Sequence, residues 1–246
     1  MKPYRPISHA IRFVVTFALL AWVGATAATG LGVTPIRIHL SEATPTAALT
    51  LENNGSNTTV VQLQLMKWDA AGADDHYRPT YEVVATPPIA TLQPGQTQIV
   101  RVGLSRDVDE GKELAYRLYI EEVPAPPQQH QQGLQVTLRI GVPIFIAPKI
   151  TAQPGLEWRA VRNGPDSVAL HATNVGNAHL RLMDLKLRSE GAEHLLAERQ
   201  VVGYLLPGQS RQWLMQVEGG LPSGRLRLSA ATDPGMADVD LELETP

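Results

Sequence analysis

The chain contains no cysteine among its 246 residues, so neither a disulfide bond nor a thiolate metal site can stabilise it. It also lacks an excess of positive charge, because 21 Lys and Arg residues face 24 Asp and Glu residues. A broad basic surface that attracts nucleic acid is therefore not expected, and neither is a nucleic-acid partner. With 43% hydrophobic residues, the folded state must be stabilised by burial of apolar side chains in a core.

The main apolar run, residues 13–23, is too short to span a bilayer. As a helix, its roughly eleven residues rise only ~16 Å, against a hydrocarbon core of ~30 Å. Lys2, Arg5 and Arg12 precede the run, and the small residues 24–28 follow it. This order predicts a cleavable export signal over residues 1–28, and no stable membrane insertion of the mature chain. A retained membrane anchor is the weaker alternative.

Motifs for catalysis and cofactor binding are missing as well. The sequence has no HExxH, no GxSxG and no glycine-rich phosphate loop, and its seven histidines are scattered. The stretch 74–76, Asp-Asp-His, reads as a solvated hairpin turn rather than a catalytic carboxylate pair. No enzyme, metal or cofactor is expected.

What is present is alternation of apolar and polar residues. It recurs at 36–40, 61–65 and 180–185, and turn-forming clusters of Asn, Pro and Gly separate the segments. Such short alternating runs favour an all-β chain built from sandwiches. The tryptophans at 68, 158 and 213 are then core or domain-packing residues.

A repeat indicates two domains. In the first copy, residues 51–57 lead into a strand, and the turn 92–97 follows. In the second copy, residues 171–177 and the turn 205–210 repeat this arrangement. Both copies have an Asn before the strand and the sequence Pro-Gly-Gln in the turn. A single repetition at roughly 115 residues indicates two homologous domains rather than a solenoid. We place the domains at 29–150 and 151–246. The alternative is a single sandwich in which the Pro-Gly-Gln motif recurs by chance.

The segment 134–146 alternates for longer than one sandwich can cover. Apolar residues occupy every even position from Leu134 to Ile146, and a strand of this length spans ~40 Å, about twice the usual. Pro143 has no N–H to give to a ladder, which predicts an edge strand or interrupted pairing. An uncovered apolar edge is a template for another chain. The alternative is an internal hairpin that bridges the two domains and exposes nothing.

The order of these blocks resembles the periplasmic chaperones of the chaperone–usher pathway, which assemble fimbriae. The resemblance rests on segments 85–89, 92–95 and 100–102, on the strand 116–124, and on the alternating strand 134–146 that closes before Pro148. It implies a fold of two immunoglobulin-like sandwiches in an L shape. It also implies a periplasmic location and a non-enzymatic function, in which the long strand completes an unfinished fimbrial subunit.

By position, this resemblance implies that Leu134, Val136, Leu138 and Ile140 are the donated side chains. Two basic residues of the family hold the subunit's terminal carboxylate, and the first falls on Arg37. The second, a lysine, aligns with Pro143, so this chain departs from the pattern. Either Arg37 anchors alone, or another cation replaces the lysine. Arg117, in a strand that should neighbour the alternating strand, and Arg101 are the candidates, whereas Lys149 lies past the end of the strand.

Alternatives remain for both anchors. Arg37 could be an ordinary surface residue of an edge strand, and Arg117 could form an ion pair with Glu121, which lies four residues along the chain and two places along on the same face of the strand.

The partners implied are fimbrial subunits and an outer-membrane usher, and the edge strand could also pair with a second copy. The alternative function is a secreted two-domain structural or adhesive fibre protein. A hydrolase on a sandwich scaffold would need a catalytic cluster that the sequence does not contain.

Overall fold

The computed structural model describes residues 30–71, 73–124, 136–190, 194–222, 224–233 and 235–245. Within these ranges the regular structure is all β-strand, as the alternation predicted. The expected export signal, residues 1–28, lies outside the described residues, as does most of the Pro/Gln-rich stretch before the long strand. The strands are β1 (Leu31–Thr34), β2 (Ile38–Leu40), β3 (Thr46–Asn53), β4 (Thr59–Ala71), β5 (Asp74–Pro79), β6 (Val83–Thr86), β7 (Ile89–Leu92), β8 (Thr97–Leu104), β9 (Leu114–Glu122), β10 (Arg139–Ile146), β11 (Leu156–Arg162), β12 (Ser167–Asn174), β13 (Leu180–Ser189), β14 (Leu195–Leu205), β15 (Ser210–Gln216), β16 (Leu226–Thr232), β17 (Gly235–Leu241) and β18 (Leu243–Glu244).

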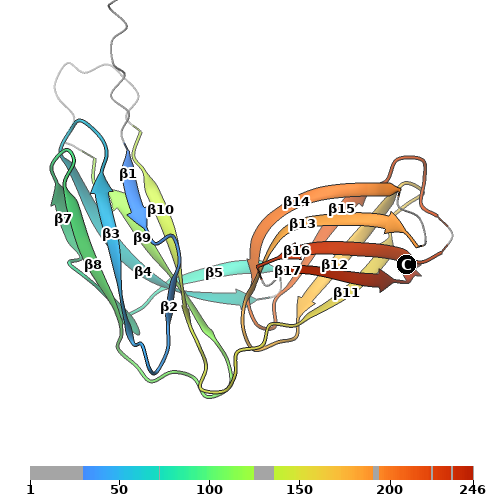
Figure 1. The fold of residues 1–246 in the computed structure, drawn as a ribbon, viewed down its shortest axis with the longest axis horizontal. Coiled ribbons are helices and arrows are strands. Elements are labelled where there is room, and N and C mark those ends of the chain that lie inside the picture. The colour runs from blue at the N-terminus through green and yellow to red at the C-terminus, as the bar shows by residue number, and fades with distance from the viewer. Residues whose placement is uncertain are drawn as a thin grey trace, which may run out of the picture.

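The strands form two sandwiches that meet at an angle, which is the L-shaped arrangement expected (Figure 1). In the first, a sheet of order β1-β3-β8-β6 faces a sheet of order β2-β10-β9-β4-β5, with β7 beside β4. In the second, β15-β12-β11-β18 faces β14-β13-β16-β17. Each sandwich has its own buried apolar core. The proposed domain boundary at residues 150 and 151 falls in the linker between β10 and β11.

The alternation at 36–40 predicted one continuous strand, but the structure has two strands, β1 and β2, with a bend between them. The chain leaves the first sheet after β1, bends at residues 35–37 and enters the second sheet as β2. Ile38 and Leu40 are buried as expected, but Ile36 is 77% exposed because it lies in the bend. The local alternation cannot reveal this change of sheet, since it continues through the bend.

The repeat is visible in the hydrogen bonds of the first domain. Asn53, the buried last residue of β3, donates through Nδ2 to the carbonyls of Asn57 and Leu92. Its Oδ1 accepts from the amide of Gly55, and its own carbonyl accepts from Gly95 at 2.8 Å. One side chain therefore ties the end of a strand to two turns.

Asn174 makes the same contacts in the second domain. Its Nδ2 donates to the carbonyls of Ala178 and Leu205, and its Oδ1 accepts from Gly176. Its carbonyl accepts from Gly208 at 2.8 Å. Gly95 and Gly208 have φ of 74° and 81°, in the left-handed region where a Cβ would be strained. The two sandwiches therefore repeat the same Asn-centred network.

We expect Asn53→Ala to destabilise the first domain by about 2–4 kcal/mol, because the buried bond to the carbonyl of Leu92 and the part-buried bond to that of Asn57 both lose their donor. Asn174→Ala should have a similar effect on the second domain. Differential scanning calorimetry would measure the two transitions. The exposed Asn57 provides the matched control: it accepts through its backbone, so Asn57→Ala should change stability by less than about 0.5 kcal/mol. Equal effects of Asn53→Ala and Asn57→Ala would contradict the assignment.

Candidate functional site

Of the strands that the structure describes, β10 has one neighbour along its whole length and a second neighbour along only part of it. It pairs antiparallel with β9 from Arg139 to Ile146. On the other side, β2 pairs in parallel with residues 144–146 alone. Within the described part of the chain, residues 139–143 have no strand on that side, so β10 has an open edge as the proline predicted.

The backbone groups on this open edge follow from the register. The amide of Glu122 donates to the carbonyl of Leu138 at 2.9 Å, which makes these two residues a hydrogen-bonded pair. Such pairs alternate along an antiparallel ladder, so Arg139 and Gly141 turn their N–H and C=O groups away from β9. Pro143 is also an odd-numbered residue, so its backbone nitrogen faces away from β9. Its missing N–H therefore costs no bond to β9.

The even-numbered side chains of β10 pass from the core to the surface. Val142 and Ile144 are buried, and Ile140 packs against the core from a partly buried position. Leu138 is 39% exposed and Val136 is 74% exposed. Leu134 lies outside the described residues. The apolar row is therefore longer than the core that covers it.

The strand is shorter than its predicted range of 134–146. Residues 136–138 are not strand, because β9 ends at Glu122 and offers no further backbone to pair with. The last contacts are at Leu138, whose carbonyl accepts from the amide of Glu122 and whose amide donates to the Glu122 carboxylate at 3.0 Å. Alternation in the sequence continues beyond the point where pairing stops.

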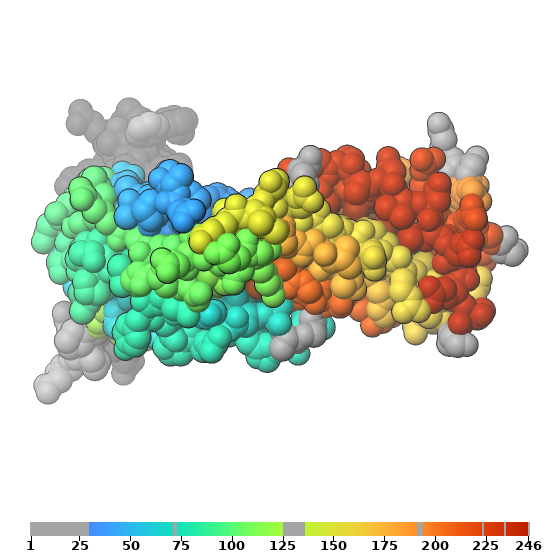
Figure 2. All heavy atoms as spheres, turned by 90° about the horizontal axis from the view of Figure 1, so that it is seen from below, coloured from blue at the N-terminus to red at the C-terminus, as the bar shows by residue number. Residues whose placement is uncertain are grey.

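A cleft of about 450 Å³ lies between the two domains. Arg117, Gly141 and Pro143 of the first domain line it, together with Arg181 and Tyr204 of the second. Seen from below, the domains meet where the linker after β10 crosses between them (Figure 2). The odd-numbered face of β10 thus forms a wall of the cleft.

Arg117 extends from β9 directly opposite Pro143. Its guanidinium carbon is 4.4 Å from the ring centre of Trp68 and 5.4 Å from that of Tyr77, a cation–π arrangement. A Cβ at Gly141 would lie 3.2 Å from Arg117 Cδ, so the glycine leaves room for the arginine. Arg117 Nε is buried without a hydrogen-bond partner among the described residues.

The alternative ion pair between Arg117 and Glu121 is wrong. Glu121 pairs instead with Arg139, its cross-strand neighbour on β10, at 2.6 Å. The guanidinium of Arg139 also lies 3.9 Å from the ring centre of Tyr119. Proximity along one strand did not decide the pairing, because the cross-strand partner of Glu121 is nearer to it than Arg117, which lies four positions along the same strand.

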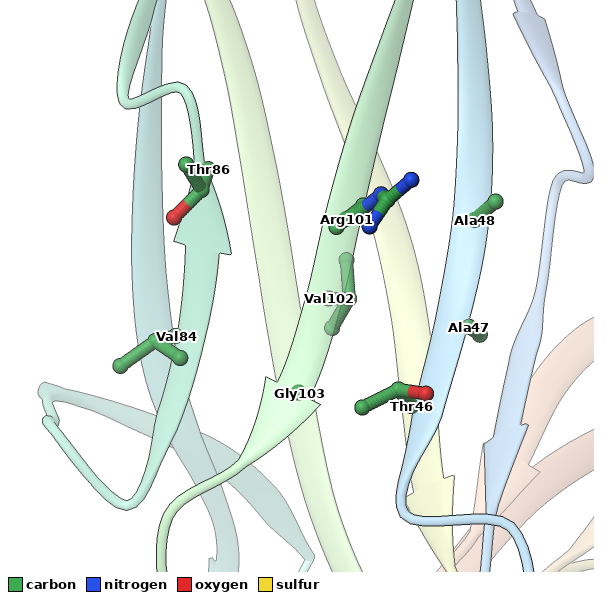
Figure 3. A pocket seen from close by; sticks show the side chains of 8 residues that line it. All are labelled: Thr46, Ala47, Ala48, Val84, Thr86, Arg101, Val102 and Gly103. Carbon is green, nitrogen blue, oxygen red and sulfur yellow. The ribbon is translucent and has the colours of Figure 1, made fainter.

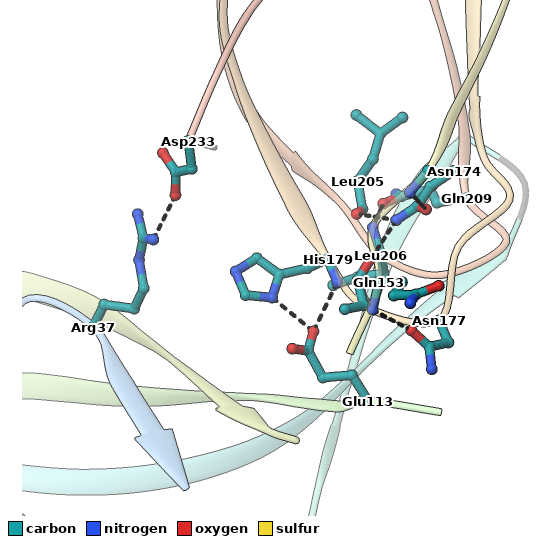
Figure 4. A network of polar contacts seen from close by, with 12 residues as sticks. Arg37, Glu113, Gln153, Asn174, Asn177, His179, Leu205, Leu206, Gln209 and Asp233 are labelled. Carbon is teal, nitrogen blue, oxygen red and sulfur yellow. Dashed lines mark hydrogen bonds and ion pairs between the residues drawn. The ribbon is translucent and has the colours of Figure 1, made fainter. Parts of the chain in front are cut away.

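Arg37 borders the same region but is already paired. Its Nη1 lies 2.5 Å from Oδ2 of Asp233 in the second domain (Figure 4). Its guanidinium carbon is 5.3 Å from the ring centre of Tyr204. Arg37 is therefore not an ordinary surface residue, and it joins the two domains.

Further contacts fix the angle between the domains. Phe145 of β10 stacks on His179, with ring centres 3.5 Å apart and planes 7° apart. Glu113 Oε1 lies 2.7 Å from His179 Nδ1 and accepts from the His179 amide (Figure 4). Trp68 is buried beside Phe145 and Leu206, which confirms it as a domain-packing residue. Trp158 and Trp213 pack against the core of the second domain.

The β4–β5 hairpin reaches the second domain and forms a polar latch there. Asp75 accepts from Gln209 Nε2 at 2.9 Å and from Arg211 Nη2 at 2.8 Å. Burial favours the protonated form of Asp75, but these hydrogen bonds together with the positive charge of Arg211 lower the pKa of the carboxyl group. The prediction of a solvated turn was wrong for Asp75, since its partners are distant in sequence.

A second hollow, of about 520 Å³, lies on the sheet of β3, β6 and β8 (Figure 3). Its lining includes Thr46, Val84 and Arg101. Arg101 is therefore separated from the cleft and does not share it with Arg117. Lys149 is paired with Glu110 at 2.6 Å.

Residues 30–152 match the family model for pili and flagellar-assembly chaperones, PapD N-terminal domain. The match covers half of the chain, and the chain belongs to this family of non-enzymatic periplasmic chaperones. The prediction of a chaperone–usher pilus-assembly chaperone is confirmed, over the alternative of a fibre protein.

Relatives agree with this assignment. The chaperone protein FimB/FhaD of Bordetella pertussis is 24% identical over 188 residues, which cover 71% of this chain and 75% of the relative.

Two solved complexes share the fold. One is the CsuC–CsuE chaperone–tip adhesion subunit pre-assembly complex from archaic chaperone–usher pili of Acinetobacter baumannii, with a TM-score of 0.64 and 21% identity over 88% of this chain and 99% of that chain. The other is the SafA pilin with the SafB chaperone of Salmonella enterica, with a TM-score of 0.60 and 17% identity over 88% and 97%.

Within the described ranges, none of the residues belongs to a helix that is long and apolar enough to cross a membrane.

We expect Asp75→Asn to lower the free energy of unfolding at pH 7 by about 1 kcal/mol, because the hydrogen bonds from Gln209 and Arg211 lose their charge assistance. The pKa of Asp75 is lower in the folded than in the unfolded chain. The stabilisation is therefore present above about pH 4 and is lost as the pH falls through the folded-state pKa. Urea unfolding at pH 7 and at lower pH would measure it.

Asp74→Asn is the matched control, because Asp74 is exposed on the same strand. It should leave stability at pH 7 nearly unchanged. A wild-type advantage over Asp75→Asn that persists undiminished at low pH would contradict the latch.

Proposed function

We propose that this protein is a periplasmic chaperone that binds fimbrial subunits by lending them the open edge of β10, and that it passes them to an outer-membrane usher. The observation that carries the proposal has two parts. No described strand pairs with the open edge of residues 139–143, and the apolar row of β10 leaves the core at Leu138. The family membership supports it, and two solved relatives are chaperone–subunit complexes.

The edge supplies both parts of a strand-addition contact. The N–H and C=O groups of Arg139 and Gly141 give affinity through ladder hydrogen bonds, and alternate side chains give specificity by filling pockets. The donated side chains are Leu134, Val136, Leu138 and Ile140. Burial of each contributes roughly 1.5–3 kcal/mol before ordering costs, so the row contributes on the order of 6–12 kcal/mol in all.

The cleft provides an anchor for the subunit's terminal carboxylate. Arg117 stands across the ladder from Pro143, the position where the resemblance led us to expect a lysine. A cation thus lies on the neighbouring strand, next to Gly141 on the face of β10 that lines the cleft. Arg37 is the second proposed anchor; it would contact a subunit carboxylate by exchanging it for Asp233.

The sequence contains no nucleotide-binding motif, so release of the subunit is expected through exchange with a better-fitting strand of the next subunit. In the absence of a subunit, the same open edge can pair with a second copy of the chaperone. Both steps involve only β-augmentation and need no cofactor.

We expect Leu138→Asp to abolish co-purification of a fimbrial subunit with the chaperone. An aspartate carboxylate in an apolar pocket costs several kcal/mol, whereas the free chaperone should fold normally because Leu138 is partly exposed. Co-expression followed by affinity purification would measure subunit recovery, and circular dichroism would confirm folding.

Thr137→Asp is the control for this experiment. Thr137 is exposed beside Leu138, and in the proposed donated strand its side chain would point to the face opposite that of Leu138. Subunit recovery should persist in this variant. Full recovery with Leu138→Asp would rule out donation by this row.

We expect Arg117→Gln to weaken subunit binding by about 10- to 100-fold, since a charged hydrogen bond contributes ~1.5–3 kcal/mol. Arg37→Gln should weaken binding if Arg37 exchanges partners as proposed. Arg101→Gln is the control, because Arg101 lies on the other sheet. Competition binding with a purified subunit would give the ratios, and no loss at either Arg117 or Arg37 would refute the carboxylate anchor.

A further inference from the structure

The cleft between the domains carries more positive than negative charge. Three arginines line it, Arg117 from the first domain and Arg181 and Arg211 from the second, and Asp75 is the acidic residue among its walls. Asp75 is paired with Arg211 at 2.8 Å. Among the residues that the structure describes, neither Arg117 nor Arg181 forms an ion pair, so two cationic side chains face the cleft without a counter-charge.

Arg181 reaches the cleft because of its place on β13. Its neighbours Leu180 and Leu182 point into the core of the second domain and are buried. Alternation therefore turns Arg181 to the outer face, where it lies opposite Tyr204 in the ladder. Tyr204 packs against Trp68 and Phe145 at the domain junction. This position directs Arg181 toward the first domain.

Arg117 is held in place from the opposite side. Trp68 and Tyr77 flank its guanidinium, and Gly141 leaves the space that it occupies. Its buried Nε lacks a partner within the described ranges. A guanidinium fixed in this way loses little freedom when it binds a carboxylate.

We infer that Arg181 is a third, specificity-determining anchor beside Arg117 and Arg37, and that Arg117 and Arg181 clamp the terminal carboxylate of the subunit between the two domains. This inference rests on the proposed function and adds a residue of the second domain to the subunit site. The rims of the cleft carry exposed apolar side chains, Ile36 at 77% and Val202 at 71%. They suit a polypeptide end with an apolar last residue.

The consequence is that recognition of the chain end depends on the angle between the domains. Arg117 and Arg181 lie in different domains. They can bind one carboxylate together only when the contacts between the domains, such as Phe145 stacked on His179, hold them at the right separation. An anchor built from the first domain alone would not depend on them.

The test compares two synthetic peptides that carry the last residues of a fimbrial subunit, one as the free acid and one as the C-terminal amide. Isothermal titration calorimetry with the wild-type chaperone should give about 10- to 100-fold tighter binding of the acid. Arg181→Gln should reduce this acid-to-amide ratio to within a few fold of one, as should Arg117→Gln. Arg188→Gln, at the other end of β13, should leave the ratio unchanged.

Three outcomes would overturn the clamp: equal binding of acid and amide by the wild type, binding of neither peptide, or an unchanged ratio in Arg181→Gln. The Leu138→Asp variant separates this failure from that of the proposed function. If Leu138→Asp loses whole-subunit binding while Arg181→Gln keeps the acid-to-amide ratio, strand donation stands without the clamp. If neither variant has an effect, both proposals fail.

Discussion

Among the residues that the structure describes, strand β10 has a backbone neighbour on only one side over residues 139–143, and the rest of the described molecule is organised around this constraint. β2 meets the strand only at its last three residues, because the chain changes sheets at the bend 35–37. The open edge cannot be satisfied by the described part of the chain, and its apolar side chains leave the core at Leu138. A stable folded domain therefore presents an incomplete sheet, which is the condition for completing another fold.

The two faces of β10 have different tasks. Its even-numbered residues pack into the core and continue outward as the proposed donor row. Its odd-numbered residues, Gly141, Pro143 and Phe145, face the cleft and the elbow between the domains. The strand that pairs with a subunit is thus also part of the interdomain packing, so subunit docking and domain angle share one rigid element.

Much of the fold could be read from the sequence because its signals are local. Alternation with period two predicts strands, and the paired Asn and Pro-Gly-Gln segments predicted two related domains. The hydrogen bonds of the structure repeat in the same way, since Asn53 and Asn174 donate to equivalent carbonyls. Arg117 was identified as a candidate from its strand beside the alternating segment. Its suggested pairing with Glu121 failed because cross-strand geometry favours Arg139.

The sequence by itself determined the all-β class, the two-domain plan and the row of apolar side chains that is longer than the core covering it. Each of these depends on residues near one another in the chain. Only the tertiary structure decided where pairing of β10 stops, which cations of the cleft keep a free charge, and how the domains are held. Asp233 meets Arg37 and Asp75 meets Arg211 across 196 and 136 residues. No local pattern encodes contacts of that separation, since they arise only after both sandwiches have formed and docked.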